Sequence, residues 1–122
     1  MSGQATILVA EDDANLRVVI RMVLEREGYL VVEARNGADA ITAMEGGRLP
    51  GLVLADARMP IMGGVELVQR IRANPRTASI PVILLSGFSN VGESGADAVI
   101  VKPFDPARLV DVVRGLLERP LP

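Results

Sequence analysis

Short apolar runs alternate with amphipathic stretches along most of the chain. Five runs rich in Val, Ile and Leu occupy residues 6–10, 30–34, 52–55, 80–85 and 98–101. Continuous apolar runs of this length are typical of parallel strands that are covered on both faces. Because strands that alternate with helices are joined by right-handed crossovers, the pattern predicts an α/β fold built on an open parallel sheet.

The stretches between the runs have helical periodicity. In residues 16–24 apolar side chains recur at helical spacing, while Arg17 and other charged residues fall largely on the opposite side. Gly28 is expected to end this helix. Three further helices are predicted. One covers residues 37–45, one includes residues 65–71 and stops before Pro75, and one begins after Asp105, which has the character of an N-cap.

One crossover lacks a helical pattern. Residues 86–97, SGFSNVGESGAD, are rich in Ser and Gly, and they only reach the length of about a dozen residues that a parallel crossover needs. We expect a loop or at most a single turn there. The prediction is therefore one doubly wound, five-stranded parallel sheet in the flavodoxin-like order 2-1-3-4-5, with the fourth helix shortened or absent.

Composition narrows the classes of function. A length of 122 residues suits one domain, residues 1–122, and 49% hydrophobic but 2% aromatic residues predict an aliphatic core. The net charge of −2 and the lack of a basic run argue against direct binding of nucleic acid. There is no Cys and no His, which excludes disulfides, thiolate sites and a phosphohistidine of the chain's own. No apolar run approaches the ~20 residues of a membrane span and no signal peptide is evident, so we expect a soluble, cytoplasmic domain without membrane contact.

Polar side chains follow the strands at the sheet edge where ligands bind in such folds. They are Glu11, Asp12 and Asp13 after the first strand, Asp56 at the end of the third, Ser86 after the fourth, and Lys102 after the fifth. Carboxylates gathered this closely repel one another and need a cation in order to ionise together. Oxygen ligands without His or Cys favour Mg²⁺, or Mn²⁺.

The same edge offers the groups that phosphoryl transfer requires. Lys102 supplies a fixed positive charge, and the Ser86 hydroxyl is a donor for a phosphoryl oxygen. Asp56 would be the nucleophile and would form an acyl phosphate. Asp13 is instead interpreted as an N-cap, outside the metal shell.

With these features in place, the chain resembles the response-regulator receiver domains of two-component signalling, the chemotaxis regulators among them. The matching segments are ILVAEDD (7–13), EARNGADA (33–40), LVLADARMP with Gly64 (52–64), PVILLSG (81–87), GAD (95–97) and VKPF (101–104). The resemblance implies that Asp56 is the phosphoacceptor and that Glu11 and Asp12 bind Mg²⁺ with Asp56 and the backbone carbonyl of Arg58. It also implies roles for the Ser86 hydroxyl and for Lys102, whose bond to Pro103 is usually cis in the family.

The chain departs from the family pattern at several positions. Val99 stands where receivers usually have Tyr or Phe, and Gly63 stands where an Asp often precedes the glycine. We hypothesise that activation orders the 86–97 segment. A second hypothesis is that Arg58 and Phe88 hinder the hydrolytic water, so that Arg58→Ala or Phe88→Ala would speed loss of the phosphoryl group.

The predicted function is that of a Mg²⁺-dependent phosphoacceptor switch, which catalyses only its own phosphorylation and dephosphorylation and is not otherwise an enzyme. The resemblance implies a sensor histidine kinase or phosphotransfer protein as donor, and an effector domain or a dimer partner as further contacts. Two alternatives stay open. One is a pseudo-receiver that binds proteins without carrying phosphate; the other is a Mg²⁺-dependent phosphatase with an Asp nucleophile, which would need an acid where Arg58 stands.

Overall fold

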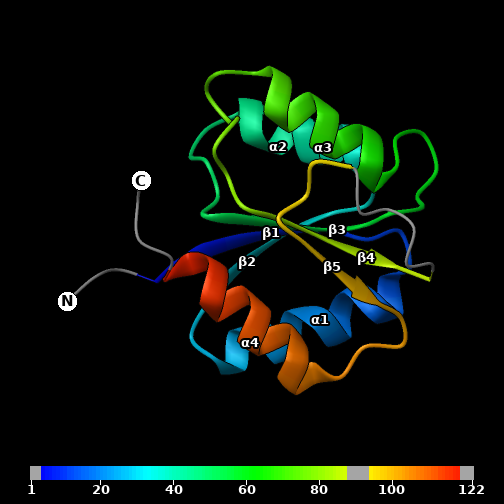
Figure 1. Cartoon of the computed structure of the whole chain (residues 1–122), viewed down its shortest axis with the longest axis vertical. Coiled ribbons are helices and arrows are strands. Elements are labelled where there is room, and N and C mark those ends of the chain that lie inside the picture. Colours follow the sequence, from blue (N-terminus) through cyan, green and yellow to red (C-terminus); the bar gives the residue numbers. More distant parts are fainter. Residues whose placement is uncertain (1–3, 88–93, 119–122) are drawn as a thin grey trace.

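A five-stranded parallel sheet with helices on both faces forms the molecule (Figure 1). The computed structural model describes residues 4–87 and 94–118. Within them the chain runs through β1 (Thr6–Ala10), α1 (Ala14–Arg26), β2 (Leu30–Ala34), α2 (Gly37–Glu45), β3 (Leu52–Asp56), α3 (Gly64–Ala73), β4 (Val82–Ser86), β5 (Ala98–Val101) and α4 (Pro106–Leu117). The strand order β2-β1-β3-β4-β5 confirms the predicted topology.

The sheet separates two aliphatic cores. Helices α2 and α3 cover one face, and α1 and α4 cover the other (Figure 1). Alternate residues of β1 serve the two cores, with Leu8 on the α2/α3 side and Ile7 on the α1/α4 side. Every residue of β3 and β4 is buried, as expected for central strands of a doubly wound sheet.

Strand β2 differs from the prediction that both faces of each strand are covered. It lies at the edge of the sheet, and Leu30 and Val32 are 50% and 44% exposed. Their neighbours Val31 and Glu33 lie opposite Ile7 and Val9 of β1, on the α1 side. Because β2 is an edge strand, it has a neighbouring strand on one side only, and alternate side chains along it stay exposed.

Side-chain caps fix where the helices begin. The Asp13 carboxylate accepts the backbone N–H groups of Asn15 and Leu16, which confirms Asp13 as the N-cap of α1. Asp105 likewise caps α4. At the other end of α1 the helix stops at Arg26, and Gly28 adopts a φ of 93°. Such a backbone conformation favours glycine, as the sequence predicted for this position.

The segment between β4 and β5 is described only in part. Its described residues, 87 and 94–97, contain no helix. The rest of the predicted loop, residues 88–93 with Phe88, lies outside the described residues. In the described parts of the chain, none of the helices has the length and apolar character needed to cross a membrane.

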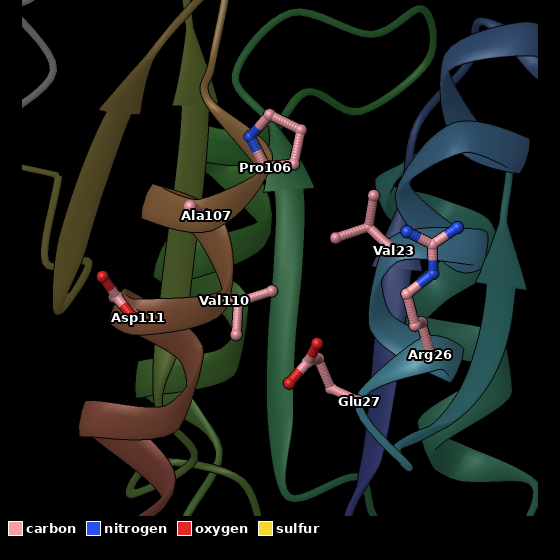
Figure 2. A pocket seen from close by; sticks show the side chains of 7 residues that line it. All are labelled: Val23, Arg26, Glu27, Pro106, Ala107, Val110 and Asp111. Carbon is pink, nitrogen blue, oxygen red and sulfur yellow. The ribbon is translucent and has the colours of Figure 1, made fainter.

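A shallow cavity lies between α1 and α4 (Figure 2). Val23 and Val110 extend into the space between the two helices, while Arg26, Glu27 and Asp111 are charged residues of its lining. Glu27 also accepts a 2.9 Å hydrogen bond from Arg114 of α4. This cavity belongs to the contact between the two helices.

An arginine of α3 anchors the start of β5. The Arg72 guanidinium lies 2.8 Å from an Asp97 carboxylate oxygen, and that oxygen also accepts the Val82 backbone N–H at 2.8 Å. Arg72 further donates to the backbone carbonyls of Ala78, Ile80 and Gly95. One side chain therefore joins α3, the start of β4 and the residues that lead into β5.

Replacement of Arg72 by Ala is expected to lower the free energy of unfolding by about 2 kcal/mol, because several carbonyls and a partly buried carboxylate lose a charged donor. Arg70→Ala is the matched control. Within the described part of the chain, the ion pair of Arg70 is with Glu66, and both side chains are exposed, so its removal should cost less than about 0.5 kcal/mol. Urea denaturation measures both values, and equal stabilities of the two variants would contradict the anchoring role.

Candidate functional site

The carboxyl ends of four neighbouring strands bring the predicted polar groups to one edge of the sheet. Glu11 and Asp12 directly follow β1, and Asp56 is the last residue of the adjacent β3. Ser86 ends β4, next to β3, and Lys102 follows β5. These residues meet because parallel strands all end at the same edge of a sheet.

Three carboxylates converge at this edge. Glu11, Asp12 and Asp56 each offer an oxygen, and these oxygens lie within 4.8 Å of one another. Glu11 is 1% and Asp56 6% exposed, whereas Asp12 is exposed. The group thus has two acids inside the molecule and one at its surface, an arrangement that is open to a ligand from solvent.

Lys102 supplies the opposing charge. Its ammonium contacts Asp56 Oδ1 and lies 3.6 Å from Glu11 Oε1. Its backbone N–H donates to the Ser86 carbonyl at 2.7 Å, and the Lys102–Pro103 bond is cis, as the resemblance implied. Burial alone would lower the pKa of Lys102, but the hydrogen bond to Asp56 and the charges of Glu11 and Asp56 outweigh it, so this pKa lies above its ordinary value.

The two carboxylate oxygens of Glu11 have different surroundings. Its Oε2 accepts the Asp13 backbone N–H at 3.0 Å, while its buried Oε1 has no hydrogen-bond partner among the described residues and meets the Lys102 ammonium only at 3.6 Å. Burial raises the pKa of Glu11 from its ordinary value of 4.5 to about 7; the Asp13 hydrogen bond opposes this rise and the Asp56 charge adds to it. A buried carboxylate oxygen that faces two other acids fits a hard divalent cation.

The raised pKa of Glu11 predicts a pH dependence of stability. Between pH 4.5 and about 7 the folded, metal-free chain keeps a proton that the unfolded chain loses. Stability due to Glu11 is therefore fully present below pH 4.5 and is lost as the pH rises to 7. Glu11→Gln removes this loss, so its stability relative to the parent should rise by about 1 to 3 kcal/mol across that range. Urea denaturation in EDTA measures the difference, and a difference that is constant with pH would contradict the assignment.

Two glycines set the loop behind Asp56. A Cβ at Gly64 would lie 2.4 Å from the Asp56 carbonyl oxygen, and one at Gly63 would lie 2.7 Å from the Ala57 carbonyl oxygen. The Gly64 backbone N–H donates to that Ala57 carbonyl at 3.0 Å. The start of α3 thus packs directly against the backbone that carries the Asp56 side chain. Because Gly63 has no Cβ, it can lie close to the Ala57 carbonyl.

A family model described as the response regulator receiver domain matches residues 7–114. The chain belongs to this family. Receiver domains are phosphoacceptor switches of two-component systems; they bind Mg²⁺ and interact with histidine kinases. The acidic group of this receiver fits such a metal site.

Relatives and solved structures agree with this membership. The transcriptional regulatory protein ResD of Bacillus subtilis (strain 168) is 38% identical over 97% of this chain, which spans about half the length of ResD (50%). The receiver domain of a signal transduction histidine kinase from Syntrophus aciditrophicus has a TM-score of 0.89 and 32% identity, over 96% of this chain and 95% of that one. The response regulator TrrA of Thermotoga maritima, solved in complex with Mg(2+)-BeF, has a TM-score of 0.84 and 32% identity, over 93% of this chain and 99% of TrrA.

Other predicted site residues of the receiver lie around the acids. Ser86 is buried, and its role toward a phosphoryl group stays a prediction. Arg58 lines a surface hollow with Asp12 and Met59. The roles of its carbonyl in metal binding and of its side chain in phosphate lifetime stay predictions. Val99 is partly buried against the α2/α3 core.

The sequence interpretation missed Arg17, which it assigned to the solvent side of α1. Its side chain is only 15% exposed, and it donates to the Glu11 backbone carbonyl at 2.8 Å. Its other partner, Glu33, was the available signal. A carboxylate within the apolar run 30–34 needs a partner, and a basic residue of the neighbouring helix is the obvious source.

Proposed function

We propose that this receiver takes up a phosphoryl group on Asp56 from a phosphohistidine of a separate molecule or domain. The observation that supports it is the meeting of the Glu11, Asp12 and Asp56 oxygens within 4.8 Å, with the Lys102 ammonium on Asp56. Glu11, Asp12, Asp56 and the Arg58 carbonyl would hold Mg²⁺ or Mn²⁺, whose charge offsets that of the acids and of the phosphoryl oxygens.

In the transfer step a carboxylate oxygen of Asp56 forms a bond to phosphorus. The bond between phosphorus and the imidazole nitrogen of the donor breaks, and its electron pair leaves with the imidazole. Lys102 compensates negative charge that would otherwise repel the phosphoryl group, and the Ser86 hydroxyl donates to one of its oxygens. The Glu11 carboxylate, held through the Asp13 N–H, stays oriented toward the acids.

The wider role follows from this step. Residues 1–122 would form one receiver domain that acts as a switch rather than as an enzyme on other substrates, located in the cytoplasm. A sensor histidine kinase or a phosphotransfer protein would be its donor. Because relatives such as ResD are about twice as long, the signal would pass to an effector domain or to a dimer partner.

Acetyl phosphate tests the proposal without a cognate kinase. With Mg²⁺ the chain should gain one phosphoryl group by intact-mass spectrometry, and excess EDTA should prevent the gain. If neither acetyl phosphate nor a panel of phosphorylated histidine kinases gave a mass gain in Mg²⁺, the proposal would be wrong and the pseudo-receiver alternative would hold.

A further inference from the structure

Arg17 joins three elements next to the acidic group. From α1 its Nη1 donates to the Glu11 backbone carbonyl at 2.8 Å, and its Nε donates to Glu33 Oε1 of β2 at 2.7 Å. The second oxygen of Glu33 accepts Arg21 Nη1 at 2.6 Å. The planar guanidinium of Arg17 therefore binds a carbonyl and a carboxylate in one fixed geometry.

Both backbone groups of Glu11 have hydrogen-bond partners, and Arg17 supplies one of them. Its N–H donates to the Ala34 carbonyl of β2 at 3.0 Å, and its carbonyl accepts Arg17. A peptide unit is planar, so fixing the Glu11 carbonyl also fixes the plane from which the Asp12 Cα departs. The directions in which the Glu11 and Asp12 side chains leave the backbone are thus set together.

The contribution of Arg17 is one of orientation more than of charge. Its positive charge is matched by Glu33, whose pKa is lowered first by the hydrogen bond from Arg17 and then by the one from Arg21. Among the described residues, the ion pairs of Glu11 and Asp56 are made with Lys102. What Arg17 adds at this place is the donor that holds the Glu11 carbonyl.

We propose that Arg17 is a positioning residue for the metal site, which holds the Glu11–Asp12 peptide so that both carboxylates reach a cation shared with Asp56. This inference rests on the proposed function, because it concerns the same acids. A purely structural ion pair between α1 and β2 is the competing explanation. Arg21 is the control for that explanation. It also joins α1 to β2, because it donates to Glu33 and Glu25, and neither of these hydrogen bonds involves Glu11.

The experiment measures Mg²⁺ binding by calorimetry, without any phosphodonor, for the parent chain, Arg17→Met and Arg21→Met. Arg17→Met keeps roughly the length of the side chain and removes its hydrogen-bond donors. We expect its Kd for Mg²⁺ to rise about tenfold, as is usual when a residue that hydrogen-bonds to a metal ligand is lost. Arg21→Met should change the Kd less than about twofold, since Arg21 donates to Glu33 and Glu25 rather than to Glu11. Thermal unfolding of both variants records the structural cost separately.

Phosphate uptake gives a second readout. In Arg17→Met the Mg²⁺ concentration needed for half-maximal uptake from acetyl phosphate should rise by the same factor as the Kd, while the rate at saturating Mg²⁺ stays close to that of the parent. If Arg17→Met does not fold, Arg17→Lys replaces it; lysine keeps the charge but cannot bind both partners as a fork, so its Kd should still rise about threefold or more.

Equal Mg²⁺ affinities of the Arg17 and Arg21 variants would overturn the positioning role. If the parent chain itself bound no Mg²⁺, the proposed function would fail instead, so the two failures can be distinguished.

Discussion

Asp56→Asn is expected to reduce phosphate uptake from acetyl phosphate by more than about a hundredfold, to background, because a neutral amide cannot serve as the nucleophile. Asn has nearly the size and shape of Asp, so the fold should be kept. The Asp56 side chain is buried and in contact with Lys102, and Lys102 retains Glu11 as a second carboxylate nearby. Intact-mass spectrometry in Mg²⁺ gives the fraction phosphorylated over time.

Asp13→Asn is the matched control for this experiment. Asp13 lies close to the acids in the chain, but its carboxylate caps α1, and Asn caps helices about as well as Asp. Its uptake should equal that of the parent. Uptake by Asp56→Asn at the parental rate, or loss of uptake in Asp13→Asn alone, would show that the acceptor is not Asp56.

Gly64→Ala is expected to lower the free energy of unfolding by about 2–3 kcal/mol, toward the upper part of the usual range for an overpacked site. The added Cβ would lie 2.4 Å from the Asp56 carbonyl oxygen and 2.8 Å from Leu84 Cδ2. The first of these is a backbone atom, so α3 or the end of β3 must move. Because that movement displaces the Asp56 backbone, phosphate uptake should fall as well.

Gly115→Ala provides the comparison. A Cβ at Gly115 would have no neighbour within 4 Å, and the residue lies inside α4, where Ala is favoured over Gly by about 0.5–1 kcal/mol. This variant should be more stable than the parent in urea denaturation. If Gly64→Ala were as stable as Gly115→Ala, the close approach of α3 to Asp56 would not be a constraint.

The strand order and the three residues of the acidic group could be predicted from the sequence alone. Apolar runs located the strands, and Asp13 and Asp105 marked helix starts, because an N-cap is recognised from local residues alone. Glu11, Asp12, Asp56 and Lys102 could be brought together because each directly follows a strand of one parallel sheet.

Features that depend on tertiary contacts were not accessible in the same way. The apolar run 30–34 resembles a strand covered on both faces, yet its place at the sheet edge leaves Leu30 and Val32 exposed. The run itself does not indicate whether the strand has a neighbour on both sides. The same limit applies to Arg17. Helical periodicity assigned it to solvent, whereas its length lets it bend toward β2 and the backbone of Glu11.

The anchoring of β5 has a consequence for how this family member can vary. The strand is tied at its start through Asp97 to Arg72, and just past its end through the Lys102 amide to Ser86. The position of Lys102 thereby depends on α3 and β4 as well as on its own strand. A substitution at Arg72 can therefore act from a distance on the ammonium that contacts Asp56.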